Sequence, residues 1–105
     1  MITAKNKKIK YGLKDLEKDF GPLTFGKLLA SYRLAEEISQ AEMAKKLKLS
    51  RQKLNDFEHG RRFPSLRMAA DIATRLKEHA PTWVSVVIEE MLRKDDLDFR
   101  VTLAG

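Results

Sequence analysis

Four polar side chains on one short segment have the types that bind the bases of DNA. They are Arg51, Gln52, Lys53 and Asn55. From a helix in the major groove, Arg pairs with guanine, and Gln or Asn pairs with adenine, each through two hydrogen bonds. Leu54 and Phe57 fall on the other side of the same segment at helical spacing. Residues 51–58 therefore predict a short amphipathic helix with a DNA-facing polar side, closed by Gly60.

The residues just before this segment predict a second helix that would position it. Ser39-Gln40-Ala41-Glu42 fits a capping box, with Ser at the N-cap and Glu three residues later. A helix over about 40–47 follows, and Ser50 offers an N-cap for the next one. Two short helices joined by a tight turn are typical of the helix-turn-helix, in which the second helix enters the major groove. The alternative is an ordinary helical hairpin with a solvated basic face.

The charge balance favours a polyanionic partner. The chain has 105 residues, enough for one domain, and a formal net charge of +6. Residues 1–62 hold 15 Lys and Arg against 8 Asp and Glu, so the positive charge lies in the half that carries the helix pair. This distribution points first to nucleic acid.

Other functional classes find little support. There is no Cys, and His59 and His79 stand alone, so we expect no metal site and no cofactor. The adjacent acids Glu89 and Glu90 are interpreted as part of a solvated face and not as a catalytic pair. We therefore expect that the protein is not an enzyme. No apolar run approaches the roughly 18 residues of a membrane span, and no signal peptide is recognisable. We therefore expect a cytoplasmic protein without a membrane partner.

The remaining pattern predicts helices around the central pair and one strand. The expected elements are a helix over 13–20, a helix from Thr24 to about Glu37, a helix from Ser65 to near His79, a helix from Thr82 to about Lys94, and a strand over 97–103 with period-two alternation. A lone strand is unstable, so it would need the segment 9–11, a second copy or another protein as its neighbour.

This division gives three parts. Residues 1–22 form a basic extension with a short helix, residues 23–80 the helix-turn-helix domain, and residues 81–105 a C-terminal helix and strand. We expect the last part to form a homodimer contact, since two recognition helices read a palindrome. The predicted contact residues are Trp83, Val87, Met91, Phe99 and Val101. The alternative for the apolar stripe of the last helix is the core of the domain itself.

At this point the chain resembles the Cro/cI-type (XRE) helix-turn-helix family. The matching residues are Arg33, Ser39-Gln40, Ala44, Leu47, Ser50-Arg51, Phe57-Glu58, Gly60 and Pro64-Ser65. The resemblance covers about half of the chain. It implies an all-α, lambda-repressor-like five-helix domain, here with an N-terminal extension helix and a C-terminal strand. It also implies a repressor that binds a palindromic operator, with double-stranded DNA as the partner.

The resemblance also implies individual roles. The residues expected near phosphates are Gln40, Lys48, Ser50, Arg61 and Arg62. Arg33 and Glu58 are expected to form a mostly buried ion pair with a structural role. Asp56 departs from the family pattern, because an acid there would either accept from cytosine N4 or repel a phosphate.

The architecture and size are also similar to HigA-like antitoxins. This similarity implies an autoregulatory repressor that is the antitoxin of a type II toxin-antitoxin pair, with a toxin protein as a further partner. The alternatives are a prophage or metabolic repressor without a toxin, and a toxin-neutralising interaction protein with secondary DNA binding.

Overall fold

The computed structural model describes residues 21–97 and 101–103, and this part of the chain is helical without a strand. Its helices are α2 (Phe25–Ala35), α3 (Gln40–Leu47), α4 (Arg51–Glu58), α5 (Leu66–Arg75) and α6 (Ala80–Lys94). The predicted helices 40–47 and 51–58 are confirmed. Residues 1–20 of the predicted basic extension, with its helix over 13–20, lie outside the described residues. None of the described helices is long and apolar enough to cross a membrane.

The helices begin where short polar side chains cap them. A hydroxyl oxygen accepts the backbone N–H three residues later at Thr24, Ser39, Ser50 and Ser65. At Ser39 the capping box is complete, because Glu42 also accepts the Ser39 N–H at 2.9 Å. This backbone hydrogen bond, together with a weaker contribution from the Ser39 side chain, holds the pKa of the Glu42 carboxyl below its ordinary value. The N-caps predicted at Ser39 and Ser50 are therefore confirmed, and Thr24 and Ser65 cap the helices that were predicted to start there.

The helices end in turns that pass through the left-handed region. After α4 the residue with positive φ is Gly60 (74°), but after the other four helices it is not a glycine. Those residues are Glu37, Lys48, Lys77 and Asp96, with φ between 57° and 60°. The sequence carries no glycine signal at these ends, and two predicted helices were too long: α2 ends at Ala35 and α5 at Arg75.

The start of α6 also differs from the prediction. Residues 80–81 were expected to break a helix, with a new start at Thr82. Instead α6 begins at Ala80 with Pro81 in its first turn. Pro is well tolerated there, because the first-turn N–H groups have no partner within the helix.

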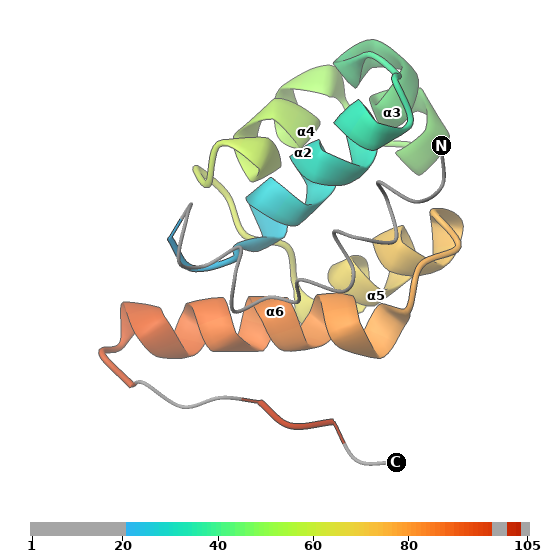
Figure 1. Cartoon of the computed structure of the whole chain (residues 1–105). Coiled ribbons are helices and arrows are strands. Elements are labelled where there is room, and N and C mark those ends of the chain that lie inside the picture. The colour runs from blue at the N-terminus through green and yellow to red at the C-terminus, as the bar shows by residue number, and fades with distance from the viewer. Residues whose placement is uncertain (1–20, 98–100, 104–105) are drawn as a thin grey trace.

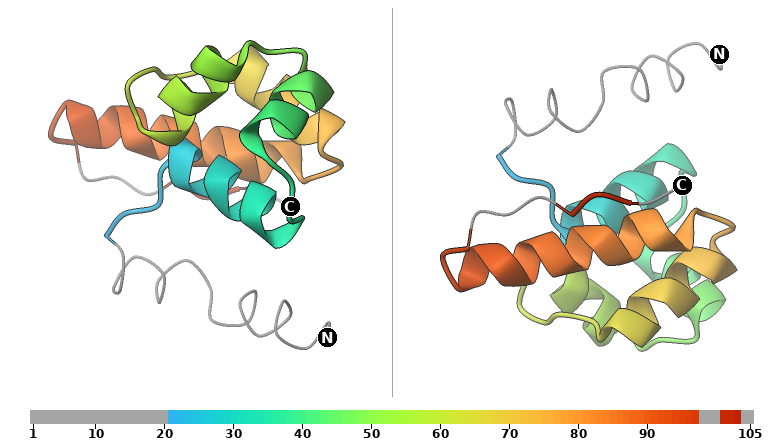
Figure 2. Two further views of the ribbon diagram at one scale, coloured as in Figure 1. Left: turned by 90° about the horizontal axis from the view of Figure 1, so that it is seen from above. Right: turned by 90° about the horizontal axis from the view of Figure 1, so that it is seen from below.

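The helices pack around one core (Figure 1). α6 lies along the lower side of the view with α5 against it, and α2 packs against both α4 and α6. In Figure 2, α6 runs behind α3 and α4 in the view from above and in front of them in the view from below, so they lie on opposite sides of the domain. Aromatic rings join these layers: Phe25 meets Phe57 and Trp83 edge-on, each at 5.9 Å between ring centroids.

Two residues that were predicted to form a dimer contact are buried in the core instead. Trp83 is 3% exposed and Val87 is 1% exposed, on the face of α6 that packs into the chain's own interior. Buried there, they are not surface groups that a second copy can reach. Met91, by contrast, is 47% exposed, and Val101 is half-buried. Phe99 lies outside the described residues.

Glu90 was interpreted as part of a solvated face, and this was wrong. It is 9% exposed, and its Oε1 accepts the backbone N–H of Phe25 at 3.0 Å. Phe25 opens α2, so the carboxylate satisfies one of the free N–H groups at that helix end. The contact fixes α6 against the beginning of α2.

The predicted strand over 97–103 is not supported. Leu97 and residues 101–103 have no strand structure, and residues 98–100 lie outside the described part. A strand needs a neighbouring strand for its backbone groups. The Val101 N–H instead donates to Oε2 of Glu89 on α6, at 2.8 Å. The backbone of Val101 is thus bonded to the side chain of Glu89 and not to a neighbouring strand.

Gly26 brings α2 unusually close to α4. A Cβ atom at this position would lie 2.2 Å from the carbonyl oxygen of Phe57 and 2.8 Å from that of Glu58. Real Cβ atoms do not approach backbone oxygens that closely, so only glycine fits. The close crossing sets the distance at which α2 braces the end of α4.

Candidate nucleic-acid interface

α3 and α4 pack against each other across a turn of three residues, 48–50. Lys48 makes the turn by adopting φ 57°, and Leu49 packs against the core. Ser50 then caps α4, its oxygen accepting the Lys53 N–H at 3.0 Å. Each step of the turn is therefore fixed by backbone conformation, burial or a cap. The arrangement holds α4 as the second helix of a helix-turn-helix.

The polar side of α4 faces solvent. Arg51 and Gln52 are exposed in its first turn, and Asn55 is half-buried one turn later. Lys53 is half-buried as well. On the opposite side Leu54 is fully buried, so the helix cannot rotate without exposing it. The predicted base-facing residue types thus lie on the outward part of a helix whose orientation the core fixes.

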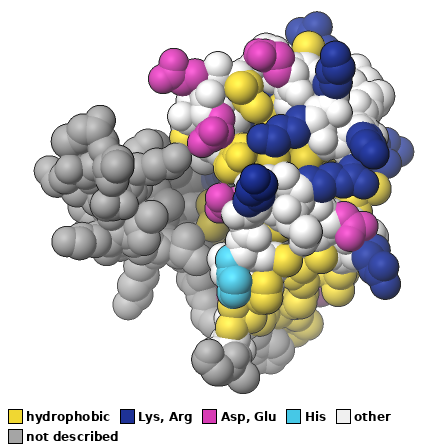
Figure 3. All heavy atoms as spheres, turned by 90° about the vertical axis from the view of Figure 1, so that its right-hand side faces the viewer, with side chains coloured by type: hydrophobic (Ala, Val, Ile, Leu, Met, Phe, Trp, Pro, Cys, Tyr) yellow, Lys and Arg dark blue, Asp and Glu magenta, His cyan; other side chains and the backbone are white. Residues whose placement is uncertain are grey.

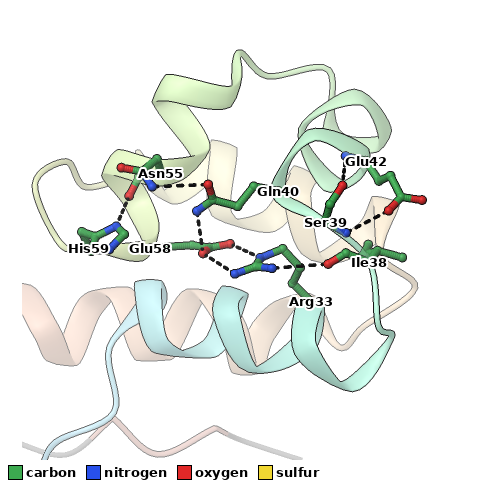
Figure 4. Close-up of polar contacts among 8 residues, drawn as sticks. All are labelled: Arg33, Ile38, Ser39, Gln40, Glu42, Asn55, Glu58 and His59. Carbon is green, nitrogen blue, oxygen red and sulfur yellow. Dashed lines mark hydrogen bonds and ion pairs between the residues drawn. The ribbon is translucent and has the colours of Figure 1, made fainter.

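The structure contains the ion pair between Arg33 of α2 and Glu58 of α4 (Figure 4). Arg33 Nε lies 2.9 Å from Oε2 of Glu58, and Nη2 lies 3.1 Å from Oε1, so the contact is bidentate. The two side chains are 18% and 4% exposed. Arg33 Nη1 also donates to the Ile38 carbonyl at 3.3 Å. The pair joins α2, the loop before α3 and the end of α4.

Gln40 extends this ion pair to the polar face of α4. Its Nε2 donates to Oε1 of Glu58 at 3.1 Å, and its Oε1 accepts from Nδ2 of Asn55 at 3.3 Å (Figure 4). Both ends of the Gln40 amide are thus engaged inside the protein. The phosphate contact expected of Gln40 stays a prediction; the second N–H of its Nε2, or an exchange of the present partners, would have to supply it.

Asp56 holds two of the predicted DNA-binding side chains. Its Oδ1 accepts from Gln52 Nε2 and from Arg61 Nε, each at 2.9 Å. Arg61 Nη2 also donates to Oδ1 of Asn55. The hydrogen bond from Arg61 is the main reason why the pKa of Asp56 lies below its ordinary value. Asp56 is therefore a carboxylate in the middle of the polar face, and the structure brings Gln52, Asn55 and Arg61 together around it.

The remaining residues predicted to contact phosphate lie at the edges of this face. Lys48, Ser50 and Arg62 are all exposed. The Ser50 oxygen is used as a cap, but its O–H remains a donor. Figure 3, which looks at the right-hand side of Figure 1, shows Lys and Arg side chains gathered over the upper part, where α3 lies. Basic groups are thus available on both sides of the turn.

Sequence reasoning missed several contacts at this site. His59 Nδ1 lies 2.9 Å from the carbonyl oxygen of Asn55, and Gly26 sets the approach of α2 to α4. The spacing from Asp56 to Gly60 and Arg61 did contain a signal. Glycine at the helix end turns the chain back, so the next side chain meets the last turn of the helix.

A comparison with protein families agrees with this geometry. A family model described as a helix-turn-helix domain matches residues 24–80, which is more than half of the 105 residues. No curated protein and no solved structure matched the chain. The matched region runs from the cap of α2 to the first residue of α6 and contains the α3–α4 pair. The chain belongs to the helix-turn-helix domain family, a class of DNA-binding proteins.

Proposed function

We propose that this protein is a transcriptional repressor of the Cro/cI type that reads its operator with α4. The observation that carries the proposal is the exposure of Arg51 and Gln52 in the first turn of a helix fixed by buried Leu54 and Phe57. N-terminal residues of a recognition helix reach base edges in this geometry. Cations at the edges of the face supply the affinity that is independent of sequence.

The first test is selection of a binding site from a pool of random duplexes. We expect enrichment of one motif, bound at least about 1,000-fold more tightly than a scrambled duplex, the lower end of the specificity of such proteins. A promoter that contains the motif should be repressed by the protein in a reporter strain. A pool that shows no enrichment would refute sequence-specific binding.

Two variants separate base reading from phosphate binding. Arg51→Ala should cost about 1–3 kcal/mol at the selected site and leave scrambled DNA nearly unaffected. Arg62→Ala should weaken both duplexes alike and reduce the salt slope by about one. Lys77→Gln removes an exposed charge outside the helix pair and serves as the control. Equal losses on both duplexes for Arg51→Ala would contradict the role of Arg51.

We further propose that the repressor acts as a homodimer through the outer side of α6 and the segment that follows it. Three large hydrophobic side chains there remain exposed: Met91 (47%), Leu97 (42%) and Leu103 (45%). A second copy would cover apolar surface of this kind. A two-fold axis would then match the two halves of a palindrome.

Charge substitutions test the dimer better than truncation does. Removing residues 82–105 would delete Trp83 and Val87 from the core and unfold the domain. Met91→Lys and Leu97→Lys leave the core intact, and we expect each to yield monomers in sedimentation equilibrium. Leu34→Lys, at a side chain that is 66% exposed on α2, is the matched control. Dimers of unchanged stability in both variants would refute this contact.

A second candidate function is that of an antitoxin in a type II toxin-antitoxin pair, which the similarity to HigA-like proteins in size and in the helix that follows the helix-turn-helix domain supports. The exposed Leu97 and Leu103 would then cover a toxin instead of a second copy. The neighbouring reading frame decides between these functions. A small basic ribonuclease-like product that co-purifies with this chain supports the antitoxin. A neighbour that neither inhibits growth nor binds the chain leaves a repressor without a toxin.

A further inference from the structure

The end of α4 places Asp56 and Arg61 against each other. The Arg61 N–H donates to the Asp56 carbonyl at 2.9 Å, and the Gly60 N–H donates to the Phe57 carbonyl at 3.1 Å. Together with φ 74° at Gly60, these bonds form a Schellman motif. The motif carries the chain back over the last turn of the helix. The turn thus places the backbone of Arg61 beside that of Asp56, and from there the Arg61 guanidinium reaches the Asp56 carboxylate.

Asp56 engages two side chains that we expect to contact DNA. Its Oδ1 accepts from both Gln52 and Arg61, the one expected at a base edge and the other at a phosphate. The Asp56 side chain is 18% exposed and that of Arg61 is 52% exposed, so solvent and a duplex can reach the pair. A carboxylate and a phosphate oxygen are alternative acceptors for the same guanidinium.

We propose that Asp56 determines the specificity of DNA binding by competing with the duplex for Arg61 and Gln52. This inference rests on the proposed function. A duplex competes with the carboxylate for Arg61, and on random DNA, where the base edges do not match the side chains of α4, only the phosphates contribute binding in return. A cognate site offers base edges as well, among them the amino group of cytosine, which donates to an Asp in the major groove. Breaking the Asp56–Arg61 ion pair costs the same free energy on every duplex, but only the cognate site offsets this cost with base contacts.

The test compares two variants that remove the same charge. Asp56→Asn keeps the shape of the side chain, and Asp71→Asn changes an exposed acid on α5. On random duplex at low salt, Asp56→Asn should bind about two- to fivefold more tightly than the wild type, since an exposed ion pair of this kind no longer has to be broken. The salt slope should steepen by about one. At the selected site the gain should be smaller, so the specificity ratio should fall.

A background substitution shows whether the effect passes through Arg61. In Arg61→Gln the carboxylate has no guanidinium to hold, so the gain from Asp56→Asn should shrink to that of Asp71→Asn. An undiminished gain would show simple charge repulsion and overturn the proposal. Asp56→Ala, at the same surface position, repeats the test without a hydrogen-bonding side chain, and circular dichroism verifies that each variant is folded.

The outcomes separate this inference from the proposed function. If the wild type selects a motif but Asp56→Asn binds random DNA no better than Asp71→Asn, only the role of Asp56 fails. If the wild type binds no duplex at all, the proposed function fails and the role of Asp56 fails with it.

Discussion

Replacing Gly26 by alanine should destabilise the domain, although alanine favours a helix. In an ordinary helix interior, Gly→Ala stabilises by about 1 kcal/mol. Here the new Cβ would lie 2.2 Å from one backbone oxygen and 2.8 Å from another, so α2 has to move away from α4. That movement stretches the ring contact of Phe25 with Phe57 and the bidentate pair behind it. Overpacking of this kind costs about 3 kcal/mol at the upper end of its usual range, and the net loss is about 2 kcal/mol.

Thermal unfolding measures this loss directly. For a domain of this size about 2 kcal/mol corresponds to a decrease in Tm of about 10 °C. Ser31→Ala, at an exposed position of the same helix, is the control and should leave Tm unchanged or slightly higher. A Gly26→Ala variant as stable as the control would show that α2 and α4 can separate freely. The close crossing would then not be a determinant of the fold.

Three further predictions concern the helix ends and the ion pair. Lys77→Gly should raise the unfolding free energy by about 0.5–1 kcal/mol, because φ is 60° there; an unchanged denaturation midpoint would contradict the strain. Arg33→Leu should cost about 3 kcal/mol, since Glu58, only 4% exposed, loses its cation; a loss below about 1 kcal/mol would contradict this. The pKa of Glu42 lies below 4.5, so its stabilisation is complete above that pH and is lost as the pH falls through the folded-state pKa. Glu42→Gln should therefore show a smaller fall in Tm between pH 7 and pH 3, and an equal fall would count against the capping box.

The beginnings of the helices could be predicted because their signals are local. A cap such as Ser39 or Ser50 and the amide that it binds lie within four residues of each other, so the sequence alone contains both partners. The helix ends gave poorer predictions. At Glu37 and Lys77 the chain enters the left-handed region without the glycine that usually marks such a turn. Nothing in a short window of sequence marks this conformation at a residue other than glycine.

Long-range contacts explain the other differences. Glu90 looked solvated because it stands next to a second acid, Glu89, but its partner Phe25 is 65 residues away. The alternation over 97–103 is typical of a strand, yet period two only states which side chains share a face. Whether a strand forms depends on a neighbour for its backbone, and Glu89 serves the Val101 N–H instead.

At the candidate site, too, some features follow from the local sequence and others depend on long-range contacts. The residue types on α4 and their outward direction follow from helical periodicity, and Arg51 and Gln52 lie on the exposed side as that periodicity requires. The contacts among the polar side chains do not follow from it. They depend on the Schellman turn at Gly60 and on side-chain rotamers, and for that reason the engagement of Arg61 by Asp56 appears only in three dimensions.

The position of Gln40 explains why an amide suits the junction between the ion pair and the DNA-facing surface. Arg33 already reaches both oxygens of Glu58, at 2.9 and 3.1 Å, so Glu58 keeps its charge partner if Gln40 turns away. A second cation at this position would be drawn to Glu58 instead of a phosphate, and an acid would repel both. The neutral amide can exchange its partners without leaving a buried charge unpaired. When it does so, Asn55 Nδ2 loses its acceptor and becomes free to donate to a base, so we expect phosphate binding by Gln40 and base reading by Asn55 to occur together.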